Sequence, residues 1–408
     1  MNLHRLSAAA CAALVLGLGL GLAFDVTAQK ADAVRPEVGK PLQDAQNLMR
    51  TGKYREAMNK VNDADAVANK TASESFLIQR MRGSVASASG DTEGAIRAFE
   101  AVLNSGRVSG RDALQMVQAV AVGYYKAKDY AKAAQWTQRY FKEGGSDPAM
   151  RTMLLQSYYL SHDCASVNKM LGSAAAEDSS RKASEEELQI LANCYLQQRD
   201  TGGYVAAIEK LVVYYPKKEY WTDLLARVQK KPGFSDRLSL HVYRLRFATG
   251  NLTKTDDYLE MAQLALQAGV PAEAKGVVDK GYEVKLLGAG KDAERHQRLR
   301  DLVTKSLAES QKNRDKEEQE ALAAKDGNDL VKIGMNYVYE GKAEKGLSLI
   351  EQGIKKGGLR RPDDAKLLLG EAQIYAGQRA RGAQTLKNVQ GSDGTADMAR
   401  LWVLHARA

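Results

Sequence analysis

A short helical signature recurs seven times along the chain, at a spacing of about 34 to 38 residues. The clearest copy contains, in order, Tyr124, Tyr125, Lys128, Asp129, Tyr130 and Ala133. The other six copies centre on Gly52-Lys53-Tyr54, Gly90-Asp91, Tyr158-Tyr159, Gly269, Gly341 and Gly377. Repeats of this length are typical of solenoids, in which hairpins of two helices stack on one another.

Each repeat contains two stretches with the period of a helix face. In residues 112–126 the apolar positions at steps of three and four are Leu114, Val117, Val120, Ala121 and Tyr124. After a polar turn, the same period continues through Tyr130, Ala133, Ala134, Thr137 and Tyr140. Two helices of this kind joined by a tight turn form an antiparallel hairpin. One hairpin cannot bury both of its apolar faces, so each needs a neighbour on either side.

This pattern resembles the tetratricopeptide repeat family. The residues that match its unit in register are Val117, Val120, Ala121, Tyr124, Asp129, Tyr130 and Ala133. The resemblance covers most of residues 42–390 and is weakest over 219–250, where Lys231-Pro232-Gly233-Phe234 replaces the usual turn. It implies an all-α, right-handed superhelical solenoid of about nine to ten antiparallel helical hairpins.

The first residues of the chain have the pattern of an export signal. A short basic start at His4 and Arg5 precedes an apolar run over 6–24, and Val26-Thr27-Ala28 supplies small residues for cleavage. We expect a cleaved signal peptide over 1–28 and a periplasmic protein of a bacterium. The alternative is an uncleaved segment that anchors the chain in the inner membrane.

Four further segments are expected after the signal. Residues 29–41 are interpreted as a flexible leader, 42–290 as the first run of repeats, and 327–408 as a second run whose last helix, 395–405, caps the stack. Between the runs, the very polar stretch 291–326 predicts a spacer. It is either one long exposed helix or two helices with a break near Asn313.

The net charge is +9, and removal of residues 1–28 leaves it unchanged because Arg5 and Asp25 cancel. Positive and negative residues are interspersed, which favours solvated helix faces. The alternative is a weak attraction to anionic surfaces of the cell envelope. No basic stripe alternates with aromatic residues, so nucleic-acid binding is not expected.

Two cysteines, Cys164 and Cys194, remain after export. In the repeat register, Cys164 enters the second helix of one unit and Cys194 lies late in the first helix of the next, so the two positions are neighbours in a stack. An oxidising compartment would then allow a disulfide, and the alternative is two buried thiols. His162 and Asp163 precede Cys164 on one turn, where the side chains diverge, so thiol catalysis is not expected.

The first helix of each repeat is expected to line the concave side of the superhelix. In this register the candidate groove contacts are Gln118, Val122, Tyr125, Gln156, Tyr159, Gln189, Asn193, Met335 and Tyr339. Tyrosine combines apolar area with a hydroxyl, which suits an extended peptide. The alternative is that several of these tyrosines only seal neighbouring helices. The family's clamp for terminal carboxylates is not expected, because Gln189 stands where it would need Lys and only Asn193 matches.

The sequence favours a non-catalytic scaffold that binds another protein or a peptide segment on this concave face. An alternative of a different class is a structural accessory subunit of an envelope export or polymer-assembly complex. A more remote one is a cell-envelope enzyme, which would need a pocket that brings His162 or His241 against a carboxylate. Isolated histidines give no metal-ligand spacing, so neither metal nor cofactor is predicted.

Overall fold

The computed structural model describes residues 33–172 and 182–408, and these residues form helices and no strand. The predicted all-α fold is confirmed. The predicted signal peptide, 1–28, lies outside the described residues. The chain divides into two compact units, Met1–Ser161 and His162–Ala408. The expected boundaries around 291–326 differ from this division, because the polar stretch lies inside the second unit.

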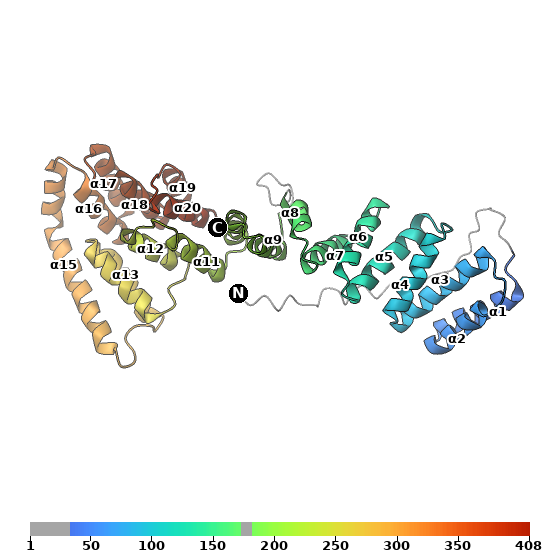
Figure 1. Ribbon diagram of the computed structural model, residues 1–408. Helices are drawn as coiled ribbons and strands as arrows, with labels where there is room; N and C mark the ends of the chain where they lie inside the picture. The colour runs from blue at the N-terminus through green and yellow to red at the C-terminus, as the bar shows by residue number, and fades with distance from the viewer. Residues whose placement is uncertain (1–32, 173–181) are drawn as a thin grey trace. The chain divides into compact units, whose positions relative to one another are not determined.

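The first unit is a stack of antiparallel helical hairpins, shown in blue to green in Figure 1. Its helices are α1 (Pro36–Arg50), α2 (Tyr54–Asp65), α3 (Ala72–Ser89), α4 (Thr92–Asn104), α5 (Gly110–Lys126), α6 (Tyr130–Lys142) and α7 (Pro148–Leu160). Each helix packs on the next one along the chain, so every hairpin covers the apolar face of its neighbour. Val117, Val120 and Ala121, which the sequence pattern places on one face, are fully buried.

The expected leader is wrong in its second half, because α1 begins at Pro36. The start of α1 is held in place by Arg35, the residue before the helix, which is hydrogen-bonded to α3. Glu74, a fully buried carboxylate on α3, accepts hydrogen bonds from the backbone nitrogen of Arg35 at 3.0 Å and from its guanidinium at 2.9 Å. Glu74 also closes a capping box with Thr71.

The second unit contains the remaining helices and a 3₁₀ turn. They are α8 (Cys164–Gly172), α9 (Glu185–Gln197), α10 (Thr201–Tyr214), α11 (Lys218–Gln229), η3 (Asp236–Leu238), α12 (Ser239–Ala248), α13 (Thr255–Gln267), α14 (Pro271–Glu283), α15 (Ala293–Ala323), α16 (Asn328–Tyr339), α17 (Ala343–Lys356), α18 (Pro362–Tyr375), α19 (Arg379–Leu386) and α20 (Thr395–Arg407). In the described part of the chain, α9 with α10, α13 with α14, α16 with α17 and α18 with α19 form closely packed hairpins.

The polar stretch forms one continuous helix, α15, with no break at Asn313. It buries a single stripe that includes Leu299 and Val303, and it packs on α13, α14 and α16 (Figure 1). Helix α16 also touches α14 directly. The buried Asn336 of α16 donates a hydrogen bond to the Gly269 carbonyl at 2.9 Å. The C-terminal repeats therefore fold back against the middle repeats.

The last helix, α20, does more than cap the end of the stack. It packs on α18 and α19, as a cap would, and also on α10 and α12. The backbone nitrogen of Ser235 donates to the carbonyl of Asp393 at 2.9 Å, and Lys231 pairs with Asp397 at 2.6 Å. The second unit is thus closed by contacts between segments more than a hundred residues apart in sequence.

The turns between paired helices share one backbone conformation. A residue with positive φ ends the first helix in turn after turn. It is Gly52 or Gly90 in some repeats and Lys128, His162 or Arg199 in others. After Gly52, Gly90, Lys128 and Arg199, the backbone nitrogen of the next residue donates to the carbonyl five residues earlier. The bond from Asp129 N to Tyr124 O at 3.0 Å is an example. This motif caps the first helix and directs the chain into the second.

Among the described residues, none of the helices combines the length and the apolar character that crossing a membrane requires.

Candidate functional site

Side-chain hydrogen bonds connect successive first helices in the first unit. Arg80 of α3 pairs with Asp112 of α5 at 2.9 Å. Gln118 of α5 donates to Asp147, the N-cap of α7, at 3.3 Å. Tyr125 of α5 donates to Gln156 of α7 at 2.9 Å. We call the surface formed by α3, α5 and α7 the first-helix face, and these bonds fix the spacing of its three helices.

The same kind of contact continues within the second unit. Gln189 of α9 donates to the hydroxyl of Tyr220 on α11 at 2.6 Å, and that hydroxyl donates to Glu185. Burial, together with the bond to Glu185, raises the pKa of Tyr220 to about 12, so it remains a neutral donor. Amide and phenol side chains therefore connect adjacent first helices in both units.

These bonds locate most of the predicted groove residues. Gln118, Tyr125, Gln156 and Gln189 are half-buried and hydrogen-bonded to the neighbouring first helix. Their contacts match the alternative in which such side chains seal adjacent helices. One edge of each side chain stays accessible, so sealing and binding can be combined.

Val122, Tyr159 and Asn193 are also partly exposed on first helices. Val122 and Tyr159 lie on the first unit, whereas Asn193 lies on α9 of the second. Val122 packs with one side on the core of the first unit. Tyr159 and Val122 therefore belong to the first-helix face, together with Tyr125.

The two candidates from the C-terminal repeat, Met335 and Tyr339, differ in burial. Met335 is only 1% exposed and lies in a core cluster with Val270, Val338 and Leu369. The prediction for Met335 is wrong because α16 is enclosed by α14, α17 and α18. Tyr339 is partly exposed, and its ring centroid lies 4.5 Å from that of the exposed Tyr375, so its place in the groove stays a prediction. Burial beside Glu273 raises the pKa of Tyr339 well above its ordinary value.

A buried charge cluster, which the sequence did not predict, lies in the second unit. It consists of His241 and Arg244 on α12, Glu273 on α14 and Glu371 on α18, and the partly exposed Tyr339 of α16 interacts with Glu273 at its edge. Arg244 donates two hydrogen bonds to Glu273, at 2.7 and 2.6 Å, and a third to Glu371 at 3.2 Å. His241 Nδ1 lies 2.8 Å from Glu371 Oε1.

The cluster is a buried ion network. The charge of Arg244 is fixed, because Glu273 and its neighbours hold the pKa of the guanidinium well above its usual value despite burial. His241 does lie against a carboxylate, as an enzyme would require, yet both side chains are at most 9% exposed. The groove between α13 and α15 is lined by other residues.

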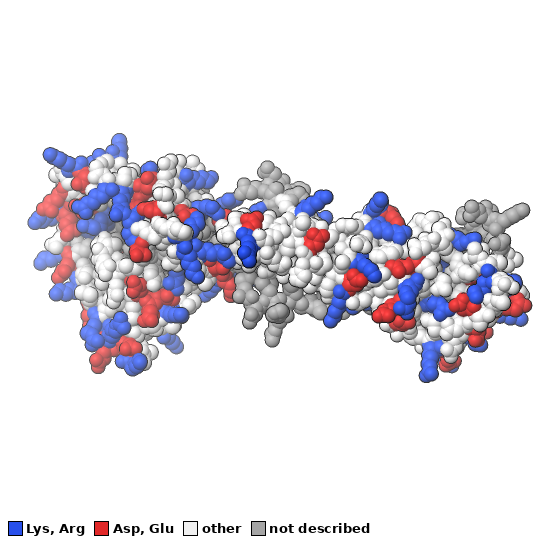
Figure 2. Space-filling model, in the orientation of Figure 1, with Lys and Arg blue, Asp and Glu red and all other residues white. Residues whose placement is uncertain are grey.

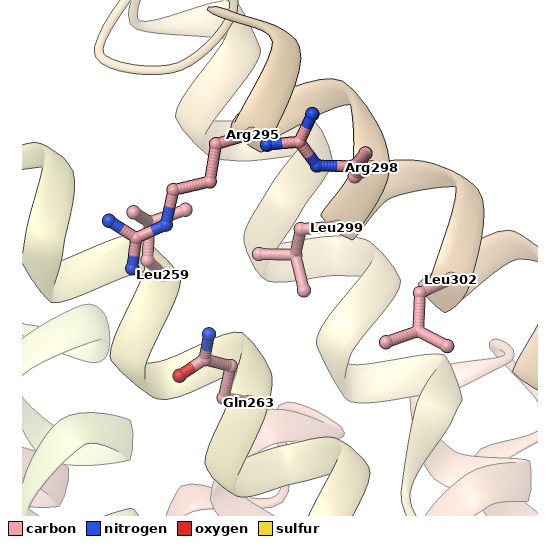
Figure 3. A pocket seen from close by; sticks show the side chains of 6 residues that line it. All are labelled: Leu259, Gln263, Arg295, Arg298, Leu299 and Leu302. Atoms are coloured by element: carbon pink, nitrogen blue, oxygen red, sulfur yellow. The ribbon is translucent and has the colours of Figure 1, made fainter. Parts of the chain in front are cut away.

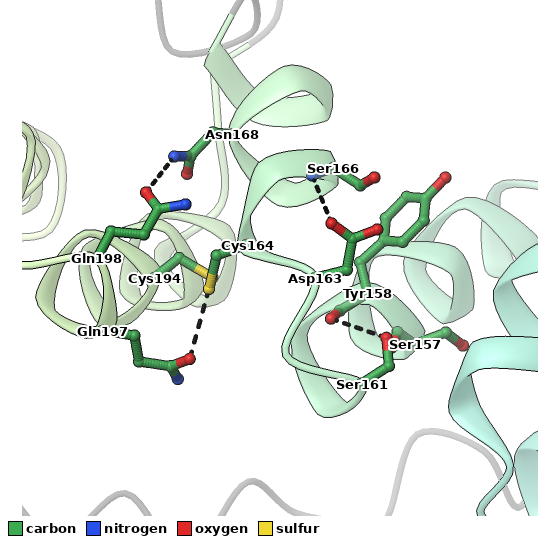
Figure 4. The surroundings of a disulfide bond; sticks show 10 residues. All are labelled: Ser157, Tyr158, Ser161, Asp163, Cys164, Ser166, Asn168, Cys194, Gln197 and Gln198. Atoms are coloured by element: carbon green, nitrogen blue, oxygen red, sulfur yellow. Dashed lines mark hydrogen bonds between the residues drawn. A yellow bond between two sulfur atoms is a disulfide. The ribbon is translucent and has the colours of Figure 1, made fainter.

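The structure joins Cys164 to Cys194 by a disulfide, with a Cα–Cα distance of 5.2 Å. Cys164 is the first residue of α8, and Cys194 lies on α9, which packs beside α8 (Figure 4). The carboxylate of Asp163 accepts a hydrogen bond from the backbone of Ser166 and so caps α8. A disulfide-bonded Cys164 has no thiolate for catalysis. His162 adopts the positive φ of the turn, and Asp163 caps the helix that follows.

No group of three or more potential metal ligands occurs among the residues that the structure covers. Basic and acidic side chains alternate on the face drawn in Figure 2, without a large area of one sign. On this face the distribution agrees with solvated helix faces and offers no continuous track for a polyanion.

No protein-family model matches the chain, and a comparison with curated proteins also found no match. Two solved structures are similar in outline. One, titled "Structure of Naa15/Naa10 bound to HypK-THB", is 14% identical with a TM-score of 0.37, over 89% of this chain and 63% of that one. The other, yeast Tom70, is 11% identical with a TM-score of 0.26, over 90% and 95%. The chain thus spans less than two thirds of the first, and similarities this low assign neither a family nor a function.

Proposed function

We propose that this chain is a non-catalytic scaffold that binds another protein or an extended peptide on the first-helix face. The observation that carries the proposal is the bond from Tyr125 to Gln156, with its companions at Gln118 and Arg80. These bonds hold half-exposed aromatic and amide groups in place before a partner arrives. A preformed surface loses less conformational entropy on binding, so a few contacts give useful affinity.

The chemistry of the face suits a peptide. Tyr125 and Tyr159 offer apolar area with a hydroxyl, Gln118 and Gln156 offer amides that can pair with a peptide backbone, and Val122 adds an apolar contact. Aromatic anchors surrounded by polar groups dominate the binding energy of many interfaces. The proposed partner is therefore a segment of another protein, and no catalytic step is required of this chain.

We further propose that the protein acts in the bacterial periplasm. The apolar run over 6–24 with small residues before position 29 supports export. The bonded Cys164 and Cys194 suit an oxidising compartment. N-terminal sequencing of the protein from bacterial envelopes should find Gln29 as the first residue. A chain that retains residues 1–28 would indicate the membrane-anchored alternative.

The binding proposal is tested by crosslinking in intact cells. A photoreactive residue at Val122 or Tyr159 should capture a partner, whereas the same residue at Gln135, exposed on the second helix α6, should not. The captured protein is identified, and its affinity for purified variants is measured. Tyr125→Ala with Tyr159→Ala should weaken binding by at least about tenfold. The exposed Tyr214→Ala on α10 is the matched control.

Either of two outcomes would contradict binding on this face. The first is capture from Gln135 as efficient as from Val122. The second is unchanged affinity in the double tyrosine variant, with its helix content intact. Both outcomes would favour the accessory-subunit alternative, in which contacts use the second helices or the ends of the stack.

A further inference from the structure

A groove opens between α13 and α15, away from the first-helix face. Its cavity of about 210 Å³ is lined by Leu259 and Gln263 of α13 and by Arg295, Arg298, Leu299 and Leu302 of α15. Figure 3 shows the leucines of both helices along the groove and the two arginines at its rim, with Arg295 reaching over toward Leu259. The groove thus has an apolar floor and a basic edge.

The α15 side of the groove is a regular helix stripe. Arg295, Arg298, Leu299 and Leu302 follow the i, i+3, i+4, i+7 spacing of one face. Leu299 is 8% exposed, but Leu302 is 52% exposed on a helix that is otherwise very polar. A single exposed leucine is ordinary, yet here it extends the apolar floor of a cavity.

The basic rim is electrostatically available. Arg295 and Arg298 are both exposed. Arg298 lies 3.8 Å from Glu294, but the two side chains are 71% and 93% exposed, and such surface pairs contribute little. A carboxylate that approached over the apolar floor would meet two guanidinium groups in a partly desolvated setting, where charge-assisted bonds are stronger.

We propose that this groove binds an amphipathic helix of a partner protein, with leucine-like side chains on one face and aspartate or glutamate beside them. The two parallel ridges of α13 and α15 form a seat for a third helix, as in other helix-in-groove complexes. The proposal names a second contact surface for the scaffold, so it rests on the chain being a protein binder but not on the first-helix face. The cavity is smaller than the roughly 300–1,000 Å³ of small-molecule pockets, which favours an inserted side chain over a free ligand or a lipid tail.

The test uses a fluorescent helical peptide with leucine at i, i+3, i+4 and i+7 and glutamate at the flanking positions. A second peptide carries lysine in place of glutamate. Anisotropy titrations against the full chain should show saturable binding of the glutamate peptide, weakened by salt, and little binding of the lysine peptide. R295E with R298E, or L302D alone, should weaken binding by at least about tenfold.

A matched control makes the same change in net charge on the same helix, α15, but leaves the residues that line the groove unchanged. K305E with K312E reverses two exposed lysines of α15 outside the lining residues and should change affinity by less than about twofold. Equal effects of the two double variants would mean that only net charge matters and would overturn the proposal. No saturable binding of the glutamate peptide, or binding that survives R295E with R298E, would overturn it as well.

Two further readouts distinguish helix binding in this groove from membrane binding and from binding on the first-helix face. Vesicles of phosphatidylglycerol that bind the chain, and cease to bind R295E with R298E, would assign the groove to a membrane surface instead. The variant Tyr125→Ala with Tyr159→Ala should bind the peptide normally, because those residues belong to the first unit. Peptide binding in the groove and partner binding on the first-helix face are therefore tested independently of each other.

Discussion

Arg244 on α12 and Glu273 on α14 form a two-bond ion pair, at 2.7 and 2.6 Å, inside the second unit. The two side chains are 3% and 2% exposed. Glu371, which comes from α18 and accepts the third bond of Arg244, brings the C-terminal repeats into the same cluster. Where α18 lies against α12, the buried carboxylate of Glu371 is thus paired with His241 and Arg244, which are more than a hundred residues away in sequence.

Replacing Arg244 with Met should lower the free energy of unfolding by about 3–5 kcal/mol, because it leaves Glu273 and Glu371 buried without their cation. Urea denaturation followed by the fluorescence of Trp221 and Trp402, both in the second unit, measures the loss. Lys316→Met on α15 breaks an exposed pair with Glu320 in the same unit and should cost less than about 1 kcal/mol. A cost for Arg244→Met no larger than that of Lys316→Met would refute the structural role of the cluster.

Removing the disulfide should destabilise the second unit. The bond spans 30 residues, and a crosslink of that span restricts the unfolded chain by about 3–4 kcal/mol. Cys164→Ser with Cys194→Ser should lower the urea midpoint accordingly, and a reducing agent should do the same to the wild type but not to the variant. Counting thiols in the unreduced, denatured protein is the direct check. Two reactive thiols per chain would show that the bond does not form.

Two turns can be improved by glycine. Lys128 and Arg199 adopt φ values of 62° and 58°, where an L side chain is strained and glycine is not. Lys128→Gly and Arg199→Gly should each stabilise their unit by about 0.5–1 kcal/mol. Gln135→Gly, in the exposed middle of α6, should instead destabilise by about 1 kcal/mol. A loss of stability in both turn variants would contradict the shared turn conformation.

The second unit should lose stability in mild acid through His405. Its imidazole packs edge-on against Trp402 and Trp221, with centroids 5.5 and 6.0 Å away. Burial, with a smaller effect of Arg379, lowers the pKa of His405 from 6.5 to about 4. Between these values the unfolded chain binds the proton and the folded chain does not, so this contribution to stability is complete above pH 6.5 and falls away toward pH 4.

The magnitude for His405 is about 2 kcal/mol or less, because the ring is partly exposed to screening solvent. Other groups also titrate in this range, so the informative quantity is the difference from His405→Phe. Urea midpoints at a series of pH values should fall more steeply for the wild type than for that variant. Parallel curves would mean that His405 is protonated equally in both states.

The sequence predicted those features that depend on short stretches of chain. Leu114, Val117, Val120, Ala121 and Tyr124 specify one helix face whatever surrounds them, because a helix repeats every 3.6 residues. The helical spans and the turns at Gly52 or Lys128 follow from the same local rules. The proximity of Cys164 and Cys194 was predictable too, since adjacent repeats stack in chain order.

Surface and interior were harder to predict wherever the stack folds back on itself. Met335 has the register of a groove residue and is buried, because α14 and α18 cover α16. His241 looked isolated, yet its partner Glu371 lies 130 residues away. The groove at Leu299 and Leu302 was not predicted, because the very polar stretch 291–326 indicated only a spacer. Its other wall, Leu259, could not be assigned from sequence.

The amino-acid sequence by itself determined the helices, their pairing into hairpins and the order in which the hairpins follow one another, because each depends on contacts within one or two repeats. Only the tertiary structure decided that α16, α18 and α20 return to α10, α12 and α14, which buried residues meet there, and which leucines of α15 stay exposed. Local periodicity fixes which face of a helix is apolar. The partner of that face is selected by packing and charge matching over the whole unit, to which all its distant segments contribute at once.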